Sequence, residues 1–148
     1  MKTRAVLPQV LFFGALALMI AFTGACVSTG TPSTGTPVLL GEDNLSRLTG
    51  KWSGRAESWG VGGSSPSSNA VSLRIQDKGI AKFSLGTGED WDTIVQFKDG
   101  KAVMGYGYGY REFILKESNG RLTLEASYEA FWQGQPRNYR IVLTKRGG

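Results

Sequence analysis

The sequence predicts an all-β domain: an up-and-down antiparallel meander of about eight strands that closes into a barrel.

 
Apolar and polar residues alternate in one short segment after another from Lys51 onward, which is typical of strands with one face in a core and one in water. Asp99-Gly100 and Asn119-Gly120 are strong signals for tight hairpins. Closure into a barrel removes the two exposed edges of an open sheet. An open sheet or a sandwich is the alternative.

The elements are expected in a simple order along the chain. A short helical turn at Glu42–Leu48 comes first, because Leu45 and Leu48 lie three residues apart on one face. The expected strands are Lys51–Trp59, Asn69–Gln76, Ala81–Leu85, Trp91–Phe97, Ala102–Tyr106, Tyr110–Lys116, Arg121–Tyr128 and Tyr139–Thr144. Further turns are expected at Asp77–Gly79, Gly86–Asp90 and Gln133–Pro136.

Large side chains occupy the inward phase of these strands. They are Trp52, Phe83, Trp91, Phe97, Phe113 and Tyr139. The interior of an eight-stranded barrel is either just filled by side chains or just able to hold one ligand. These residues favour a filled interior.

The first 25 residues have the pattern of a secretory signal peptide. Lys2 and Arg4 precede an apolar run from Val10 to Phe22, and small residues follow it. The run is about a dozen residues long, shorter than the roughly 20 that a membrane-crossing helix needs. We therefore expect a signal peptide over residues 1–25.

Cys26 is the only cysteine of the chain and directly follows Thr23-Gly24-Ala25. A small residue before a lone cysteine at this place resembles the bacterial lipoprotein signal. The resemblance implies a diacylglycerol on the Cys26 thiol, an acylated first residue after cleavage and a membrane-anchored address in the cell envelope. Val27 implies the outer membrane if the source is Gram-negative. The alternative is a secreted protein with an incidental thiol, which would be a liability in an oxidising compartment.

Residues 26–44 are expected to tether this lipid to a folded domain over residues 45–148. Ser28–Pro37 is a tandem pair of Ser-Thr-Gly-Thr-Pro without an apolar side chain, so we do not expect it in a core. About 14 flexible residues would span roughly 20 Å.

Composition excludes several function classes. The chain has no histidine, the commonest general base and metal ligand. With Cys26 lipidated, serine–histidine, cysteine–histidine and zinc chemistry are excluded as well. Without Lys2 and Arg4, 15 basic residues face 12 acidic ones, a formal charge of +3 that is scattered along the chain, whereas nucleic-acid binding needs a concentrated basic face. We expect no metal, no cofactor and no nucleic-acid partner.

The domain opens with Leu48-Thr49-Gly50-Lys51-Trp52. A Gly-x-Trp at the head of the first strand of an eight-stranded meander resembles the calycins, the lipocalins, avidins and their relatives. The resemblance implies that Trp52 plugs one barrel end, with Arg140 or Lys145 across it in a cation–π contact of about 0.5–2 kcal/mol. It also implies that the loop 60–68 lies at the open mouth.

The chain departs from that family in several ways. It has no Thr-Asp-Tyr segment, no helix after the barrel and no recognisable biotin-contacting pattern. The resemblance therefore bears on fold rather than on function. Small lipoprotein barrels also include periplasmic inhibitors of bacterial metalloproteases and lysozymes, but their disulfide cysteines are absent here.

Aromatic residues supply the candidate binding site. In Gly105-Tyr106-Gly107-Tyr108-Gly109-Tyr110 a continuous strand would place three tyrosines on one face, suited to sugar rings or a protein partner. The interpretation that we favour is a hairpin near Tyr108-Gly109, with the tyrosines in the core or at the barrel rim. Trp59 and Trp132 border loops that would meet the Gly86–Asp90 loop at one mouth, as a ligand entrance or as caps of the core.

Acidic residues offer weaker candidates. Glu89, Asp90 and Asp92 lack the ligand spacing of a calcium loop and are expected in a solvated turn. Glu112, Glu125 and Glu129 would be the residues of a glycoside hydrolase, but Glu125 is expected to face outward without an assigned partner.

The sequence therefore predicts a lipid-anchored barrel that binds without catalysing. The expected ligand is a small apolar or amphipathic molecule, a glycan or an envelope protein. The alternatives are a protein-directed inhibitor or assembly factor and, as a weaker hypothesis, a hydrolase.

Overall fold

The computed structural model describes residues 33–61 and 66–147. The expected signal peptide and Cys26 lie outside these residues. The strands are β1 (Thr36–Val38), β2 (Gly50–Gly60), β3 (Ser67–Ile75), β4 (Ile80–Leu85), β5 (Asp90–Ile94), β6 (Gln96–Lys98), β7 (Lys101–Tyr106), β8 (Gly109–Ser118), β9 (Arg121–Trp132) and β10 (Gln135–Lys145). The 3-10 helix η1 (Glu42–Asn44) and the helix α1 (Leu45–Leu48) form the expected helical turn.

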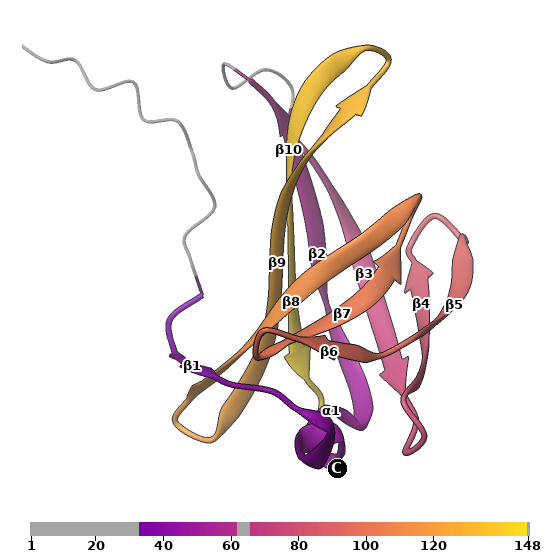
Figure 1. Cartoon of the computed structure of the whole chain (residues 1–148). Coiled ribbons are helices and arrows are strands. Elements are labelled where there is room, and N and C mark those ends of the chain that lie inside the picture. Colours follow the sequence, from indigo (N-terminus) through magenta and orange to yellow (C-terminus); the bar gives the residue numbers. More distant parts are fainter. Residues whose placement is uncertain (1–32, 62–65, 148) are drawn as a thin grey trace, which may run out of the picture.

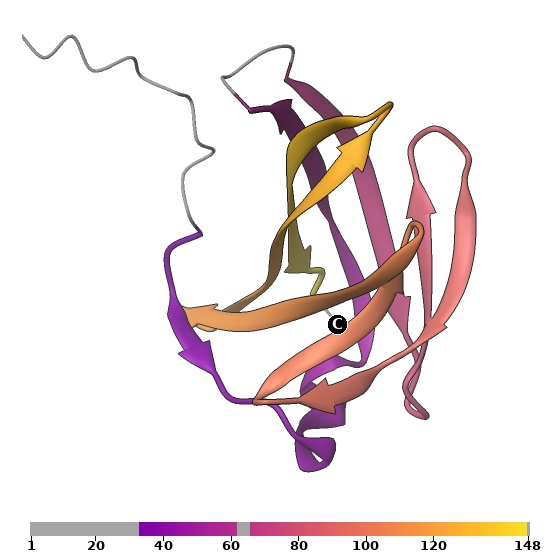
Figure 2. The ribbon, with the colours of Figure 1, turned by 45° about the horizontal axis from the view of Figure 1, so that its top comes forward.

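The expected all-β meander is confirmed. All ladders are antiparallel, neighbouring strands follow one another in the sheet, and β10 pairs with β2, which joins the end of the meander to its beginning. β5 and β6 are two parts of one bent strand, separated at Val95, whose N–H donates to the Gly79 carbonyl over 2.8 Å. The barrel wall thus consists of eight segments, and the strands surround a common interior (Figures 1 and 2).

The barrel is nearly rather than fully closed. Among the described strands, β5 and β7 share no backbone ladder. Side chains bridge this seam instead: the Gly105 N–H donates to Thr93 Oγ1 over 2.7 Å, and Trp91 Nε1 donates to the Gly105 carbonyl over 3.1 Å. These bonds satisfy backbone groups of β7 that an open edge would leave to water.

Three hairpins turn through a non-glycine residue followed by glycine, both at positive φ. They are Asp99-Gly100, Asn119-Gly120 and Gln133-Gly134. Asp and Asn tolerate this conformation better than most residues, which is why the first two were predictable. The third turn is tighter than the expected Gln133–Pro136, because Gln135 and Pro136 already belong to β10.

The end of the barrel near α1 is filled with side chains. Trp52, Phe83 and Phe113 are almost completely buried, as expected, together with smaller apolar residues from every side of the wall. The Phe83 ring lies 5.6 Å from Trp91 and 6.0 Å from Phe113, centroid to centroid. Trp91 and Phe97 pack against this core but are only partly buried. Tyr139 is partly buried as well, and its ring stacks on Tyr128.

Trp52 closes this filled end. Its Nε1 donates to the Leu48 carbonyl over 2.8 Å, so the indole is tied to α1. The cation over its ring is Lys145, with Nζ 5.8 Å from the centroid, and the same Nζ donates to the Arg47 carbonyl over 2.8 Å. Burial and, secondly, the charge of Arg47 lower the pKa of Lys145. The expectation for Arg140 is corrected: it pairs with Glu125 on the outer wall.

The segment before the barrel lies against it instead of standing free. β1 pairs with β8, with Val38 opposite Leu115, and Leu40 is buried in the core. The range expected as a tether, residues 26–44, therefore contains a strand and a core residue in its described part. The last two residues of the repeat, Thr36 and Pro37, belong to β1, and a backbone ladder does not require apolar side chains.

Glu125 lies beneath this N-terminal segment. It faces outward from β9, as expected, but it is buried, with its Oε2 2.7 Å from Lys116 Nζ and its Oε1 2.7 Å from Arg140 Nη2. Ser33 Oγ donates to Oε2 over 2.5 Å. Burial raises the pKa of Glu125, but the hydrogen bonds from Lys116, Ser33 and Arg140 outweigh it and hold the pKa below its ordinary value. Alternation predicted the direction of this side chain but not the segment that covers it.

Candidate ligand-binding site

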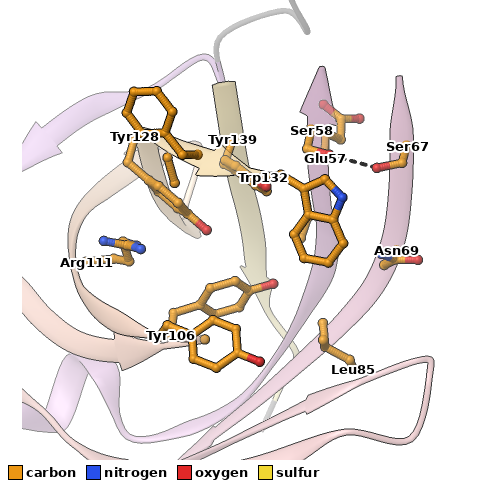
Figure 3. Close-up of a pocket in the computed structure, with 15 residues that line it drawn as sticks. Glu57, Ser58, Ser67, Asn69, Leu85, Tyr106, Arg111, Tyr128, Trp132 and Tyr139 are labelled. Carbon is orange, nitrogen blue, oxygen red and sulfur yellow. Dashed lines mark hydrogen bonds between the residues drawn. The ribbon is translucent and has the colours of Figure 1, made fainter. Parts of the chain in front are cut away.

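The end of the barrel opposite α1 holds an open cavity of about 360 Å³, which we call the cup (Figure 3). It lies where alternate hairpins gather, at the upper end in Figure 1. Its lining comes from β2, β3, β4 and β7 to β10: Ala56, Glu57, Ser58, Ser67, Asn69, Leu85, Tyr106, Gly107, Tyr108, Arg111, Tyr128, Ala130, Phe131, Trp132 and Tyr139.

One wall of the cup is a stack of flat groups. The rings of Tyr128 and Tyr139 are cross-strand partners, 5.1 Å apart and inclined by only 4°. The guanidinium of Arg111 lies over the other face of this pair, with Cζ 4.0 Å from the Tyr128 centroid. Burial raises the pKa of Tyr128, and the opposing contribution of Arg111 does not cancel it. The phenol therefore stays neutral at physiological pH.

Tyr106 links the cup to the filled core. Its ring meets Phe83 edge to face at 5.2 Å and Trp91 at 5.1 Å, and the side chain is largely buried. Burial is the main cause that raises the pKa of Tyr106 far above its ordinary value. The aromatic cluster around Phe83 thus ends at Tyr106, and the cavity begins there.

The facing wall is polar. Ser58 Oγ and Ser67 Oγ lie 2.7 Å apart across β2 and β3, and Asn69 lines the same side (Figure 3). Arg137 Nη2 donates to Ser58 Oγ over 3.3 Å. An aromatic wall opposite hydroxyl and amide groups suits a ligand with both an apolar body and polar substituents.

Large apolar side chains stand exposed at the rim. Tyr108 is fully exposed, and Phe131 and Trp132 are 72% and 56% exposed. All three also line the cup. Exposed apolar groups that gather beside a cavity are typical of surfaces that contact a ligand or partner.

Three of the five candidate binding residues meet at the cup: Tyr106, Tyr108 and Trp132. Trp59 does not line it, because Ala56 and Ser58 face the interior and Trp59 therefore points outward. Tyr110 is also outside it and lines a shallower hollow beside β5. The hairpin expected near Tyr108-Gly109 is confirmed, because β7 and β8 pair Tyr106 with Gly109. The other interpretation, three tyrosines on one face of a continuous strand, is wrong.

The expectation of a filled interior holds for one end of the barrel only. Sequence reasoning also missed Arg111, although it has the inward phase of Phe113 and Leu115, two and four residues later. A cation on the inward phase of a strand is the signal that would have revealed it. Tyr128 and Tyr139 were expected inward, but nothing in the alternation showed that they lie beyond the packed core.

Three of the six acidic candidates, Asp90, Glu112 and Glu125, form ion pairs with lysine or arginine. Asp90 pairs with Lys82 over 2.9 Å and Glu112 with Lys101 over 2.6 Å, while Glu125 belongs to the ion network of the outer wall. Residues 33–61 and 66–147 contain no group of three or more His, Cys, Asp or Glu side chains placed to hold a metal ion. Within the same ranges, no helix has the length and hydropathy needed to cross a bilayer.

Comparison with protein-family models, with curated proteins and with solved structures finds no match to this chain. The functional argument therefore depends on the geometry of the cup.

Proposed function

We propose that this protein is a lipid-anchored envelope barrel that binds a small amphipathic ligand in the cup and catalyses no reaction. The observation that carries the proposal is the half-empty interior: one end is packed around Trp52 and Phe83, and the other holds a cavity of about 360 Å³. Ligand pockets in proteins have volumes of about 300–1,000 Å³ and are mostly apolar with a few polar groups. The cup fits a small ligand of the size of two or three fused rings.

Occlusion of the cup tests this function. Ala130 is half-buried and lines the cavity, so Ala130→Trp places an indole inside it. We expect this full-length variant to bind the neutral aromatic amide 2-naphthamide at least about tenfold more weakly than the wild type, because the ring then lacks space. Isothermal titration calorimetry in detergent, with micelles alone as the blank, measures the difference.

Ser127→Trp is the matched control, since it adds the same indole on the exposed outer face of the same strand. It should leave 2-naphthamide binding unchanged. Equal binding by the wild type and Ala130→Trp, or no binding by either, would count against the cup as a ligand site.

The exposed rim favours a second candidate function, contact with an envelope protein as an inhibitor or assembly factor. Tyr108, Phe131 and Trp132 present aromatic area to solvent, and such residues are enriched at protein interfaces. With Ala130→Trp as the bait in an affinity capture, a protein partner that contacts the rim would still be captured. A small ligand of the cup would no longer bind this variant. Capture that survives occlusion would therefore favour this alternative.

The lipid anchor is a separate part of the proposal and is supported by the Ala25-Cys26 signal in the sequence. Cys26→Ser removes the thiol that would carry the diacylglycerol. We expect the wild-type chain in the membrane fraction, with an intact mass that includes acyl chains, and no acyl chains on the variant. A wild-type chain with an unmodified Cys26 would contradict the anchor without affecting the cup.

A further inference from the structure

We propose that the ligand of the cup carries an anionic group, a carboxylate or a similar acid, which Arg111 binds while the apolar body lies against the aromatic wall. This inference rests on the proposed function and names the class of ligand for the same site. It follows from how Arg111 is held and from the charges around it.

The guanidinium of Arg111 is fixed by its flat face. It stacks on Tyr128 at 4.0 Å from Cζ to the ring centroid, and Tyr128 is supported in turn by Tyr139. Stacking uses the face of the guanidinium and leaves its N–H groups in the plane, where they can form a fork for a carboxylate. Figure 3 shows Arg111 on the same side of the cup as Tyr106 and Tyr128.

The donors of Arg111 have few partners within the described part of the chain. Nη1 donates to the Tyr110 carbonyl over 3.2 Å, and a side-chain hydrogen bond from Arg111 to Tyr128 lowers the pKa of that phenol. Nε is buried and has no hydrogen-bond partner. Among the ion pairs of residues 33–61 and 66–147, none includes Arg111. A half-buried cation without a counter-ion is costly unless an anion joins it.

The other charges of the cup agree with an anionic ligand. Glu57 is part of the cup wall, but its neighbours Ala56 and Ser58 face inward. Because side chains alternate along β2, the carboxylate of Glu57 belongs to the outer face, where Arg140 is its cross-strand neighbour. Arg137 adds a second positive charge beside Ser58 at the polar side. Glu89 is close enough to Tyr106 to help raise its pKa, so the positive charge is local to the wall that holds Arg111. At that wall it favours an acid over an amine.

A matched pair of probes tests the inference in the full-length chain: 2-naphthoate, which is anionic, and 2-naphthamide, which has nearly the same shape without the charge. We expect the wild type to bind 2-naphthoate at least about tenfold more tightly than 2-naphthamide, as a charge-assisted hydrogen bond allows. Arg111→Gln should lose this preference and retain most of the affinity for 2-naphthamide. Arg111→Lys should restore part of the preference.

Arg121→Gln is the control, because Arg121 is exposed at the β8–β9 hairpin, far from the cup. It should behave like the wild type. Equal affinity of the wild type for both probes, or a preference for 2-naphthoate that persists in Arg111→Gln, would overturn the anionic ligand while leaving the proposed function intact. Failure of both probes to bind the wild type would contradict the proposed function itself and this inference with it.

Discussion

Gly54→Ala is expected to destabilise the barrel more than any other single methyl group added to its wall. A Cβ at Gly54 would lie 1.8 Å from the carbonyl oxygen of Val142 and 2.8 Å from its carbonyl carbon. These atoms belong to the backbone of β10. The overlap can be removed only if β2 and β10 move apart, at the pairing that joins the end of the meander to its beginning. We expect a loss of about 3 kcal/mol or more in the free energy of unfolding, at the upper end of the costs of overpacking.

Denaturant unfolding of the full-length chain, followed by far-ultraviolet circular dichroism, measures this effect. Gly41→Ala is the matched control: its φ of −148° is accessible to any residue, and an added Cβ meets nothing within 4 Å. It should unfold like the wild type. A Gly54→Ala barrel that is as stable as this control would mean that β2 and β10 do not approach as closely as described.

Glu125→Ala is expected to have the second large effect, because it removes the carboxylate that Lys116 and Arg140 share. The side chains of Lys116 and Arg140 are only 17% and 7% exposed, so neither is well solvated once the carboxylate is gone. Loss of one partner from a buried ion pair costs about 3–5 kcal/mol. The Ser33 hydroxyl also loses its acceptor, so amide hydrogen exchange in β1 should rise along with the global destabilisation.

The same network predicts a pH dependence. The pKa of Glu125 in the folded chain lies below its ordinary value of 4.5. The ionised carboxylate therefore contributes fully to the free energy of unfolding above pH 4.5, and this contribution is lost as the pH falls through the lower folded pKa. Glu125→Gln should therefore be less stable than the wild type at pH 7, and this difference should shrink as the pH falls below about 4.5.

Glu112→Ala serves as the comparison for both measurements, since its ion pair with Lys101 is largely exposed. Exposed pairs contribute little to stability, and we expect no measurable change in the unfolding midpoint. A Glu125→Ala midpoint no lower than that of Glu112→Ala would contradict the buried network.

The strands of this fold could be predicted because the alternation of apolar and polar residues within each strand shows which of its faces is buried. Alternation in Leu122–Tyr128 and Tyr139–Leu143 placed the inward side chains correctly, and Asp99-Gly100 and Asn119-Gly120 marked their turns through the backbone conformation they tolerate. Both signals are local, so they can be recognised without knowing which strands pair with each other.

The cup could not be predicted in the same way, because alternation gives the face of a side chain but not its height in the barrel. Tyr139 and Phe113 both face inward, yet one lines a cavity and the other is fully buried. The segment that covers Glu125 comes from far away in the sequence, since Ser33 and Glu125 are 92 residues apart. The hairpin at Gly107-Tyr108, by contrast, was predictable from its alternating glycines.

The most direct test of the ligand cup is native mass spectrometry of the protein after gentle extraction from the cells that produce it. The account predicts a chain that retains one small molecule, released on collisional activation and detected as an anion. Repeated preparations in which the protein emerges with its cup empty would contradict it.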